Sequence, residues 1–428
     1  MTARGAAAPH HATPPQTPRP ASAPLADSPR IGCLEDQVGR GIPGAVEAFW
    51  REVAAEGTPL IEAVPGAGDA GAGAAPADEV IATFVHRGGP AAAMVNKLHD
   101  RADPAASRMR NVEGTDVWWL AYRLPVGWRG SYHLVPGDES AEPAAAVPDP
   151  HNPRRLAQPG GADKSVAAMP QAPADDHLAP PPGTPAGAVE THEVTSAALG
   201  NTRRVWVHTP HGFSGAGAPA GGYPVLVLLD GATWFETAPI GPTLDHLYAR
   251  GELPAMVTVG VDTLGPSVRN EELTCHAPFV RFVTDELLPW VERRLPVTRD
   301  PARTVIAGQS LGGLAAAFIA GSAPERVGCV LAQSPSLWWR GRGPGGESSQ
   351  DGREWLTDWY ARRERLPVRF HLEVGCDEWV NLMPARRFRD VLEYKGYPLG
   401  YREFGGGHDV ACWRVGIAGG LASLTHGW

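Results

Sequence analysis

A serine at the tip of a predicted strand–turn–helix unit constrains this chain more than any other feature. Gly308-Gln309-Ser310-Leu311-Gly312 is a G-x-S-x-G motif, with an apolar β-type run at 304–307 before it and a small-residue helical run at 313–320 after it. This context is typical of a nucleophile elbow, because glycines permit the strained turn and close strand–helix packing. The helix start behind the serine also favours negative charge. The sequence therefore predicts Ser310 as a nucleophile at the end of a sheet strand.

A serine hydroxyl needs a base and a carboxylate that orients the base. In α/β-hydrolases the acid and then the histidine follow the nucleophile along the chain. Predicted strand 368–375 ends at Cys376-Asp377-Glu378, and predicted strand 399–404 precedes Gly405-Gly406-Gly407-His408-Asp409. We predict His408 as the general base. We favour Glu378 over Asp377 as the acid, and either carboxylate can instead be a solvated loop charge.

An oxyanion needs two backbone N–H donors. One should come from Leu311, directly after the nucleophile, and the other from the loop after an earlier strand. Predicted strand 225–229 is followed by Asp230-Gly231-Ala232, which makes Gly231 or Ala232 the second donor. Asp230 itself can belong to a simple Asp-Gly turn.

Composition narrows the class of function. The formal net charge of −9, without a long basic run, argues against a nucleic-acid partner and against binding to an anionic membrane surface. The five cysteines are scattered without a C-x-x-C motif, which is typical of a reducing cytoplasm. The 15 histidines show no metal-ligand spacing, and no segment is long and apolar enough to span a membrane. We expect a cytoplasmic enzyme without a metal or other cofactor.

The 428 residues divide into four predicted parts. Residues 1–30 are Ala/Pro-rich and lack the apolar stretch of a secretory signal, which predicts a disordered tail. Short strands with Gly/Pro turns over 31–136 predict a small β-sandwich-like domain. The Pro/Ala/Gly-rich segment 137–188 is predicted to be a linker. Alternating strands and helices over 189–428 predict an α/β-hydrolase domain with a mostly parallel sheet.

A set of separated motifs extends well beyond the elbow. In the second domain they are Gly308-Gln309-Ser310-Leu311-Gly312-Gly313-Leu314-Ala315, Gly406-Gly407-His408-Asp409, Cys412-Trp413-Arg414 and Leu229-Asp230-Gly231-x-x-Trp234. In the first they are Leu98-x-Asp100, Gly114-Thr115-Asp116-Val117-Trp118, Tyr122-Arg123-Leu124-Pro125 and Trp128-Arg129-Gly130-Ser131-Tyr132, followed by segments 149–153 and 169–173. Together these residues resemble the enterochelin (enterobactin) esterase family over nearly the whole chain after the tail. The departures are the tail, a Gly/Ala insert at 66–77 and a Gly/Ser-rich loop at 341–352.

The resemblance implies hydrolysis of the trilactone ester bonds of a catecholate siderophore, ferric or free. A ferric tris-catecholate is a trianion with aromatic faces, so its site needs cations and flat surfaces. Arg269 matches the family's R-x-x-E-L element and is expected to contact a catecholate, unless it forms a salt bridge with Glu271 or Glu272 within its own loop.

Trp413 and Arg414, beside the predicted base, are further candidates for substrate binding or for structure. Trp338 and Trp339 can be pocket walls or core residues. Fold does not fix substrate, so a broad-specificity carboxylesterase, peptidase or acyltransferase of the same fold remains an alternative. A catalytically idle siderophore-binding protein is a second alternative, against which intact Ser310 and His408 argue.

Overall fold

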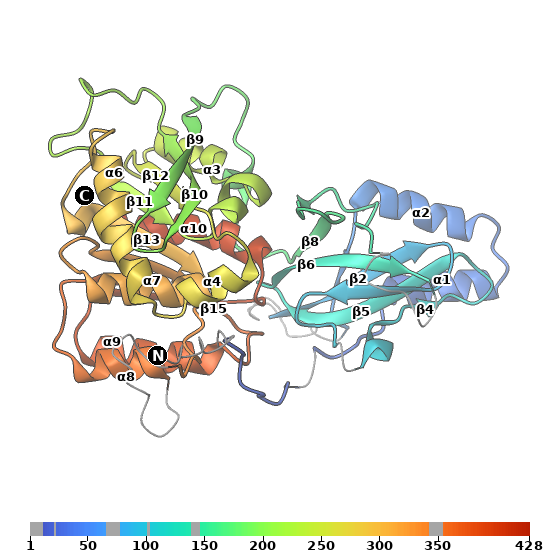
Figure 1. Ribbon diagram of the computed structural model, residues 1–428. Coiled ribbons are helices and arrows are strands. Elements are labelled where there is room, and N and C mark those ends of the chain that lie inside the picture. Colours follow the sequence, from blue (N-terminus) through green and yellow to red (C-terminus); the bar gives the residue numbers. More distant parts are fainter. Residues whose placement is uncertain (1–11, 21–22, 66–77, 101–102, 138–145, 342–353) are drawn as a thin grey trace, which may run out of the picture.

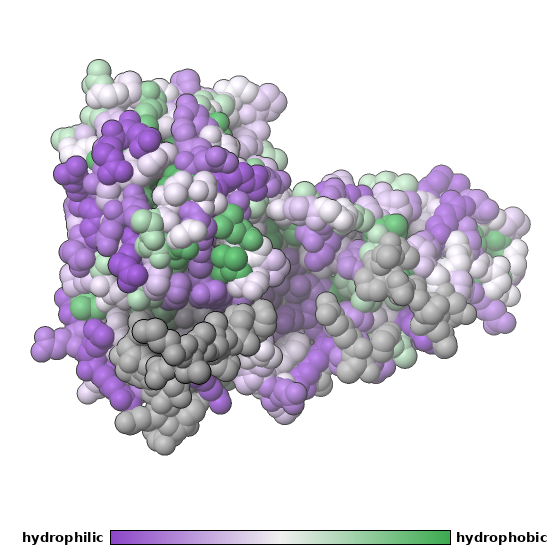
Figure 2. Space-filling model, viewed as in Figure 1, coloured by the Kyte–Doolittle hydropathy of each residue, from purple (hydrophilic) through white to green (hydrophobic). Residues whose placement is uncertain are grey.

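The computed structural model describes residues 12–20, 23–65, 78–100, 103–137, 146–341 and 354–428. They form an N-terminal β-domain and a larger α/β domain, which lie side by side (Figure 1). The space-filling view shows them as two lobes of unequal size (Figure 2). The predicted insert at 66–77 and all of the 341–352 loop except Gly341 lie outside the described residues.

The N-terminal domain contains two four-stranded sheets, with strand orders β1-β2-β5-β4 and β3-β6-β8-β7. Its elements are α1 (Pro29–Gly39), α2 (Ala45–Glu56), β1 (Leu60–Ala63), β2 (Glu79–Arg87), β3 (Ala91–Val95), η1 (Pro104–Ser107), β4 (Arg110–Asn111), β5 (Val117–Pro125), β6 (Arg129–Pro136), β7 (Arg155–Leu156), β8 (Lys164–Ala168) and η3 (Asp176–Leu178).

Side-chain alternation along the strands explains this packing. Phe84 of β2 points between the sheets, where its ring meets that of Tyr132 of β6 at a centroid distance of 4.7 Å. Its neighbour Val85 points the other way and packs with Phe49 and Trp50 of α2. The sandwich therefore has one face covered by helices.

Two predicted boundaries of the N-terminal region are wrong. Residues 164–168, placed in the predicted linker, form β8 and pair with β6. The strand is short, lies in a Pro/Ala/Gly-rich segment and pairs with a strand distant in the sequence, so local sequence did not predict it. Part of the predicted disordered tail is also held in place, since Arg123 N–H donates to Pro24 O and Ala26 N–H to Ala121 O. The rest of that prediction, residues 1–11 and 21–22, lies outside the described residues.

The second domain is built on one eight-stranded sheet with the order β16-β15-β14-β13-β11-β12-β10-β9. The strands from β16 to β12 are parallel to one another, whereas β10 pairs antiparallel with β12 and β9 pairs antiparallel with β10. The strands are β9 (Ala188–Ser196), β10 (Asn201–Thr209), β11 (Val225–Leu228), β12 (Val257–Val261), β13 (Thr304–Gln309), β14 (Cys329–Gln333), β15 (Arg369–Gly375) and β16 (Leu399–Phe404).

Helices cover both faces of this sheet, because its central strands are apolar on both sides. They are η4 (Thr233–Thr237), α3 (Ile240–Ala249), α4 (Pro266–Glu272), α5 (Ala277–Arg281), η5 (Phe282–Leu287), α6 (Leu288–Glu292), α7 (Leu311–Ser322), α8 (Trp355–Arg362), α9 (Leu382–Tyr394) and α10 (Val410–Thr425), with the short η6 (Pro301–Arg303) before β13. Val227 of β11 packs with the helix layer that contains α7, and the next residue, Leu228, with α3 and α10. The predicted α/β class, with a mostly parallel sheet behind a β-sandwich-like domain, is confirmed. Among the described helices none is both long and apolar enough to cross a membrane.

Candidate active site

Ser310 occupies a strained turn between β13 and α7. Its φ is 59° and its ψ is −122°, a conformation that L-residues rarely adopt. Gly308 and Gly312 make the turn possible, because a Cβ added to Gly308 would lie 2.9 Å from the Gly312 Cα. The predicted elbow is therefore present in the backbone, and the half-buried Ser310 stands at the carboxyl end of β13.

Two neighbouring strands end in the same way. Asp230, after β11, has a φ of 56°, and Ser334, after β14, has a φ of 46°. Backbone strain of this kind persists only where surrounding structure holds it, and it clusters at functional sites. Three adjacent parallel strands thus place strained polar residues along one edge of the sheet.

His408 and Glu378 form a hydrogen-bonded pair at this edge. The His408 Nδ1 and Glu378 Oε2 atoms are 2.6 Å apart, and the Glu378 side chain is fully buried. Burial raises the pKa of Glu378, but hydrogen bonding and charge from His408, with hydrogen bonds from Ser334 and Asn381, outweigh burial and lower it. The carboxylate is therefore held ionised. With the proton on Nδ1, the Nε2 atom is left to accept one from a nucleophile.

Glu378 is positioned by a set of short polar contacts. Its Oε1 accepts from Ser334 Oγ at 2.5 Å and from the Gly375 N–H at 2.9 Å, and its Oε2 accepts from Asn381 Nδ2 at 2.7 Å. Ser334 in turn accepts from the indole N–H of Trp413, whose ring meets the His408 ring edge-on at 4.7 Å. This network fixes the acid and the imidazole together.

Asp377 is engaged elsewhere. Its Oδ2 accepts from Trp128 Nε1 of the N-terminal domain at 2.8 Å. Asp409, beside the predicted base, caps the first turn of α10 through Ala411 N–H and also accepts from Ser131 N–H at 2.6 Å. Of the two adjacent candidates for the acid, Glu378 is the one that contacts the histidine.

Ser310, the predicted nucleophile, contacts the hydroxyl of Ser336 rather than His408. Ser310 Oγ lies 3.2 Å from Ser336 Oγ, and among the described residues no hydrogen bond joins Ser310 to His408. The 334–336 loop links the two groups, because its first residue bonds Glu378 and its last bonds Ser310. Catalytic hydrogen bonds are often long in free enzymes and tighten only with substrate bound.

The predicted oxyanion donors lie next to one another. Leu311 opens α7, where N–H groups have no partner within the helix. The loop with Gly231 and Ala232 packs against this turn, because a Cβ on Gly312 would meet Asp230 Oδ2 at 3.3 Å. The structure thus brings both donor segments to the elbow, while the identity of the second donor stays a prediction.

Arg269, the predicted catecholate contact, pairs with this same loop. Its Nε and Nη2 atoms bond the Asp230 carboxylate at 2.6 and 2.7 Å. The partner is therefore Asp230 rather than Glu271 or Glu272, and much of the arginine's charge is offset. Contact of Arg269 with a substrate stays a prediction.

The remaining predicted site residues are largely buried. Trp338 is 7% exposed and belongs to the core beside α7, with Trp339. Arg414 faces the N-terminal domain, where its Nη1 donates to Arg155 O. Trp413 contacts the His408 ring and Ser334, so its position favours a role in orienting His408 over direct contact with substrate.

Sequence reasoning missed several residues of the site. Ser334 and Asn381 contact Glu378, and Ser336 contacts Ser310. The Ser-Pro-Ser sequence directly after a predicted buried strand was the available signal for the first two. Asn96 of the N-terminal domain was also missed, and its side chain donates to the His408 carbonyl at 3.3 Å.

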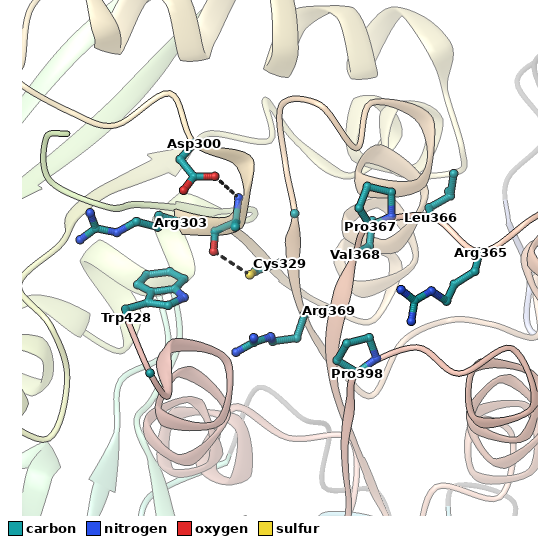
Figure 3. A pocket seen from close by; sticks show the side chains of 13 residues that line it. Asp300, Arg303, Cys329, Arg365, Leu366, Pro367, Val368, Arg369, Pro398 and Trp428 are labelled. Atoms are coloured by element: carbon teal, nitrogen blue, oxygen red, sulfur yellow. Dashed lines mark hydrogen bonds between the residues drawn. The ribbon is translucent and has the colours of Figure 1, made fainter.

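A separate cavity of about 540 Å³ lies at the opposite edge of the sheet (Figure 3). It is lined by residues at the amino ends of β13 to β16, including Arg303, Arg369 and Trp428. Ligands of open parallel sheets bind outside the carboxyl ends of the strands, so this cavity is not the catalytic site. Within the described ranges no group of three or more His, Cys, Asp or Glu residues could hold a metal ion.

Comparison with known proteins agrees with this geometry. The family model "Putative esterase" matches residues 196–424, and the model "Enterochelin esterase, N-terminal" matches residues 81–178. An iron(III) enterobactin esterase of Escherichia coli O6:H1 (strain CFT073) is 36% identical over 352 residues, which cover 77% of this chain and 84% of the relative. The chain belongs to the enterochelin esterase family. The predicted resemblance is confirmed, and the protein is a carboxylic ester hydrolase.

Two solved structures extend the comparison to the fold. The ferric enterobactin esterase of Salmonella typhimurium has a TM-score of 0.73 at 29% identity and covers 88% of this chain and 98% of its own. The enterobactin esterase of Shigella flexneri, crystallised in the presence of enterobactin, has a TM-score of 0.69 at 31% identity and covers 82% and 94%. The N-terminal family match reaches residue 178, which agrees with strand β8 belonging to the N-terminal domain.

Proposed function

We propose that this esterase cleaves the ring ester bonds of a trilactone catecholate siderophore, ferric or free, with Ser310, His408 and Glu378 as its catalytic triad. The observation that carries the assignment of residues is the 2.6 Å contact between His408 and buried Glu378, beside the strained turn of Ser310. The substrate class is supported by relatives named as enterobactin and salmochelin esterases.

The triad accounts for each proton movement. Ser310 Oγ attacks a seryl ester carbonyl while His408 Nε2 takes its proton, and Glu378 stabilises the imidazolium. The N–H of Leu311 and that of Gly231 or Ala232 stabilise the tetrahedral oxyanion. His408 then protonates the departing serine hydroxyl, which leaves an acyl-enzyme. Water, activated by the same imidazole, releases the acid and restores Ser310.

Opening the trilactone explains why such an enzyme would serve iron release. The ring holds three catechols at a high effective concentration around one ferric ion, and cutting it lowers that concentration. We place this reaction in the cytoplasm. All five cysteines are free thiols, which supports a reducing compartment.

The test compares the native chain with Ser310→Ala on ferric and iron-free catecholate trilactones, with products identified by mass spectrometry. We expect linear dihydroxybenzoylserine products from the native chain. The variant should give none and should still bind the ferric complex. Near-native turnover by Ser310→Ala would refute the triad. A native enzyme that prefers a short neutral ester to both trilactones would instead favour the broad-specificity alternative.

A further inference from the structure

Lys97 of the N-terminal domain lies against the loop that carries the catalytic histidine. The preceding residue, Asn96, donates to the His408 carbonyl. A Cβ on Gly407 would clash with the Lys97 side chain and with Asn96 Oδ1, so glycine is needed at 407 for this close approach. A cation from one domain is thereby held beside the base of the other.

The turn that presents Lys97 is fixed by a second cation. Lys97 has a left-handed φ of 64°. Arg19 donates to the carbonyls of Lys97, Leu98 and His99, and it pairs with Asp100 at 3.2 Å. Arg19 therefore shapes the turn and pairs with Asp100, and its guanidinium also lies over the ring of Trp379, with Cζ 5.4 Å from the ring centroid. Lys97 is the cation at this ring that has no ion-paired carboxylate among the described residues.

The Lys97 ammonium stands over an aromatic ring beside the acid. Its Nζ is 4.5 Å from the ring centroid of Trp379, the residue after Glu378. Burial, together with the charge of Arg19, holds the pKa of Lys97 below its ordinary value, although the negative charges of Glu378 and Asp377 raise it in part. Among the described residues, no carboxylate lies within ion-pair distance of Nζ and no hydrogen bond uses its donors.

We propose that Lys97 and the ring of Trp379 form a subsite for a catecholate group of the substrate. This inference rests on the proposed siderophore esterase function and assigns part of its specificity to the N-terminal domain. A metal-bound catecholate offers negative oxygens to the ammonium and a planar face to the indole. Because the chain has a net charge of −9, such a trianion needs a local cation without a carboxylate partner. Arg269 is already paired with Asp230, and Lys97 meets the requirement.

The test uses one ligand in two charge states, since the iron-free trilactone has largely protonated catechols at neutral pH and the ferric complex is a trianion. Lys97→Met should lower kcat/KM about tenfold on the ferric complex, the loss of one partly desolvated charge contact, and at most about twofold on the iron-free ligand. Lys97→Arg should retain most of the activity on both. The control is Lys395→Met at the C-terminal end of α9, where the ammonium donates to Arg363 O. It should leave both rates unchanged.

A binding measurement separates this subsite from the proposed function. The Kd of the ferric complex is measured by tryptophan fluorescence for Ser310→Ala and for Ser310→Ala combined with Lys97→Met. A Kd about tenfold weaker in the double variant supports the subsite whether or not the native chain hydrolyses trilactones. Equal Kd values overturn it. Equal losses of kcat/KM on both charge states would also overturn it, because they would assign Lys97 to the domain contact alone.

Discussion

Replacement of Glu378 by glutamine should remove most of the esterase activity. The carboxylate is buried and contacts His408 Nδ1 at 2.6 Å. Two unit charges about 4 Å apart attract each other by about 4 kcal/mol at an effective dielectric constant of about 20. This attraction exists only once the imidazole has taken the serine proton, so it lowers the barrier. Glutamine keeps the shape and loses the charge, which predicts a fall of about a thousandfold in kcat/KM.

The control for this experiment is the adjacent carboxylate. Asp377→Asn keeps an acceptor for Trp128 Nε1 and touches neither His408 nor Ser310, so it should cost less than about fivefold. Both variants are assayed on a chromogenic ester, after circular dichroism has shown that they are folded. Retention of more than about a tenth of the native kcat/KM by Glu378→Gln would refute the assignment of the acid. An equal loss in Asp377→Asn would do the same.

Two further predictions concern stability. Burial raises the pKa of Glu373 to about 7 from an ordinary 4.5. Protonated Glu373 therefore makes its full contribution to the free energy of unfolding below pH 4.5, and this contribution of about 3 kcal/mol is lost as the pH rises to 7. Glu373→Gln should abolish this pH dependence. Urea unfolding at pH 5 and pH 8 measures this, and identical pH dependence in both proteins would contradict it. Gly308→Ala should cost at least about 2 kcal/mol in the same assay because its Cβ would strike Gly312. The control is Gly419→Ala in the interior of α10, where an added Cβ meets no atom within 4 Å, and it should raise the free energy of unfolding by about 0.5–1 kcal/mol. A lower free energy of unfolding in both variants would contradict the explanation by steric clash at Gly308.

The positions of Ser310 and His408 at the ends of their strands were predictable because both depend on local sequence. A G-x-S-x-G turn between an apolar strand and a small-residue helix dictates the backbone of Ser310. The glycines before His408 similarly mark a loop after the last strand. Spacing along the chain identifies which strand end carries the acid, but it does not decide which of two neighbouring carboxylates turns inward. That choice depends on Ser334, which is 44 residues away in the chain, and on Asn381, three residues after Glu378.

Contacts between distant segments account for what the sequence did not predict. The pairing of Arg269 with Asp230 joins helix α4 to the loop after β11, and the two residues are 39 positions apart in the chain. Strand β8 is short and lies in a region rich in proline and alanine, so only its pairing with β6 identifies it. The position of Lys97 against Gly407 likewise depends on how the two domains dock, for which no local pattern exists.

The backbone of β6 is hydrogen-bonded to the loop that carries His408, since Arg129 N–H donates to Gly405 O and Ser131 N–H to Asp409 Oδ2. The turnover rate should therefore depend on the contact between the two domains as well as on the proposed triad. A compound that separated β6 from the 405–409 loop should lower the esterase activity without contacting Ser310 and without unfolding either domain.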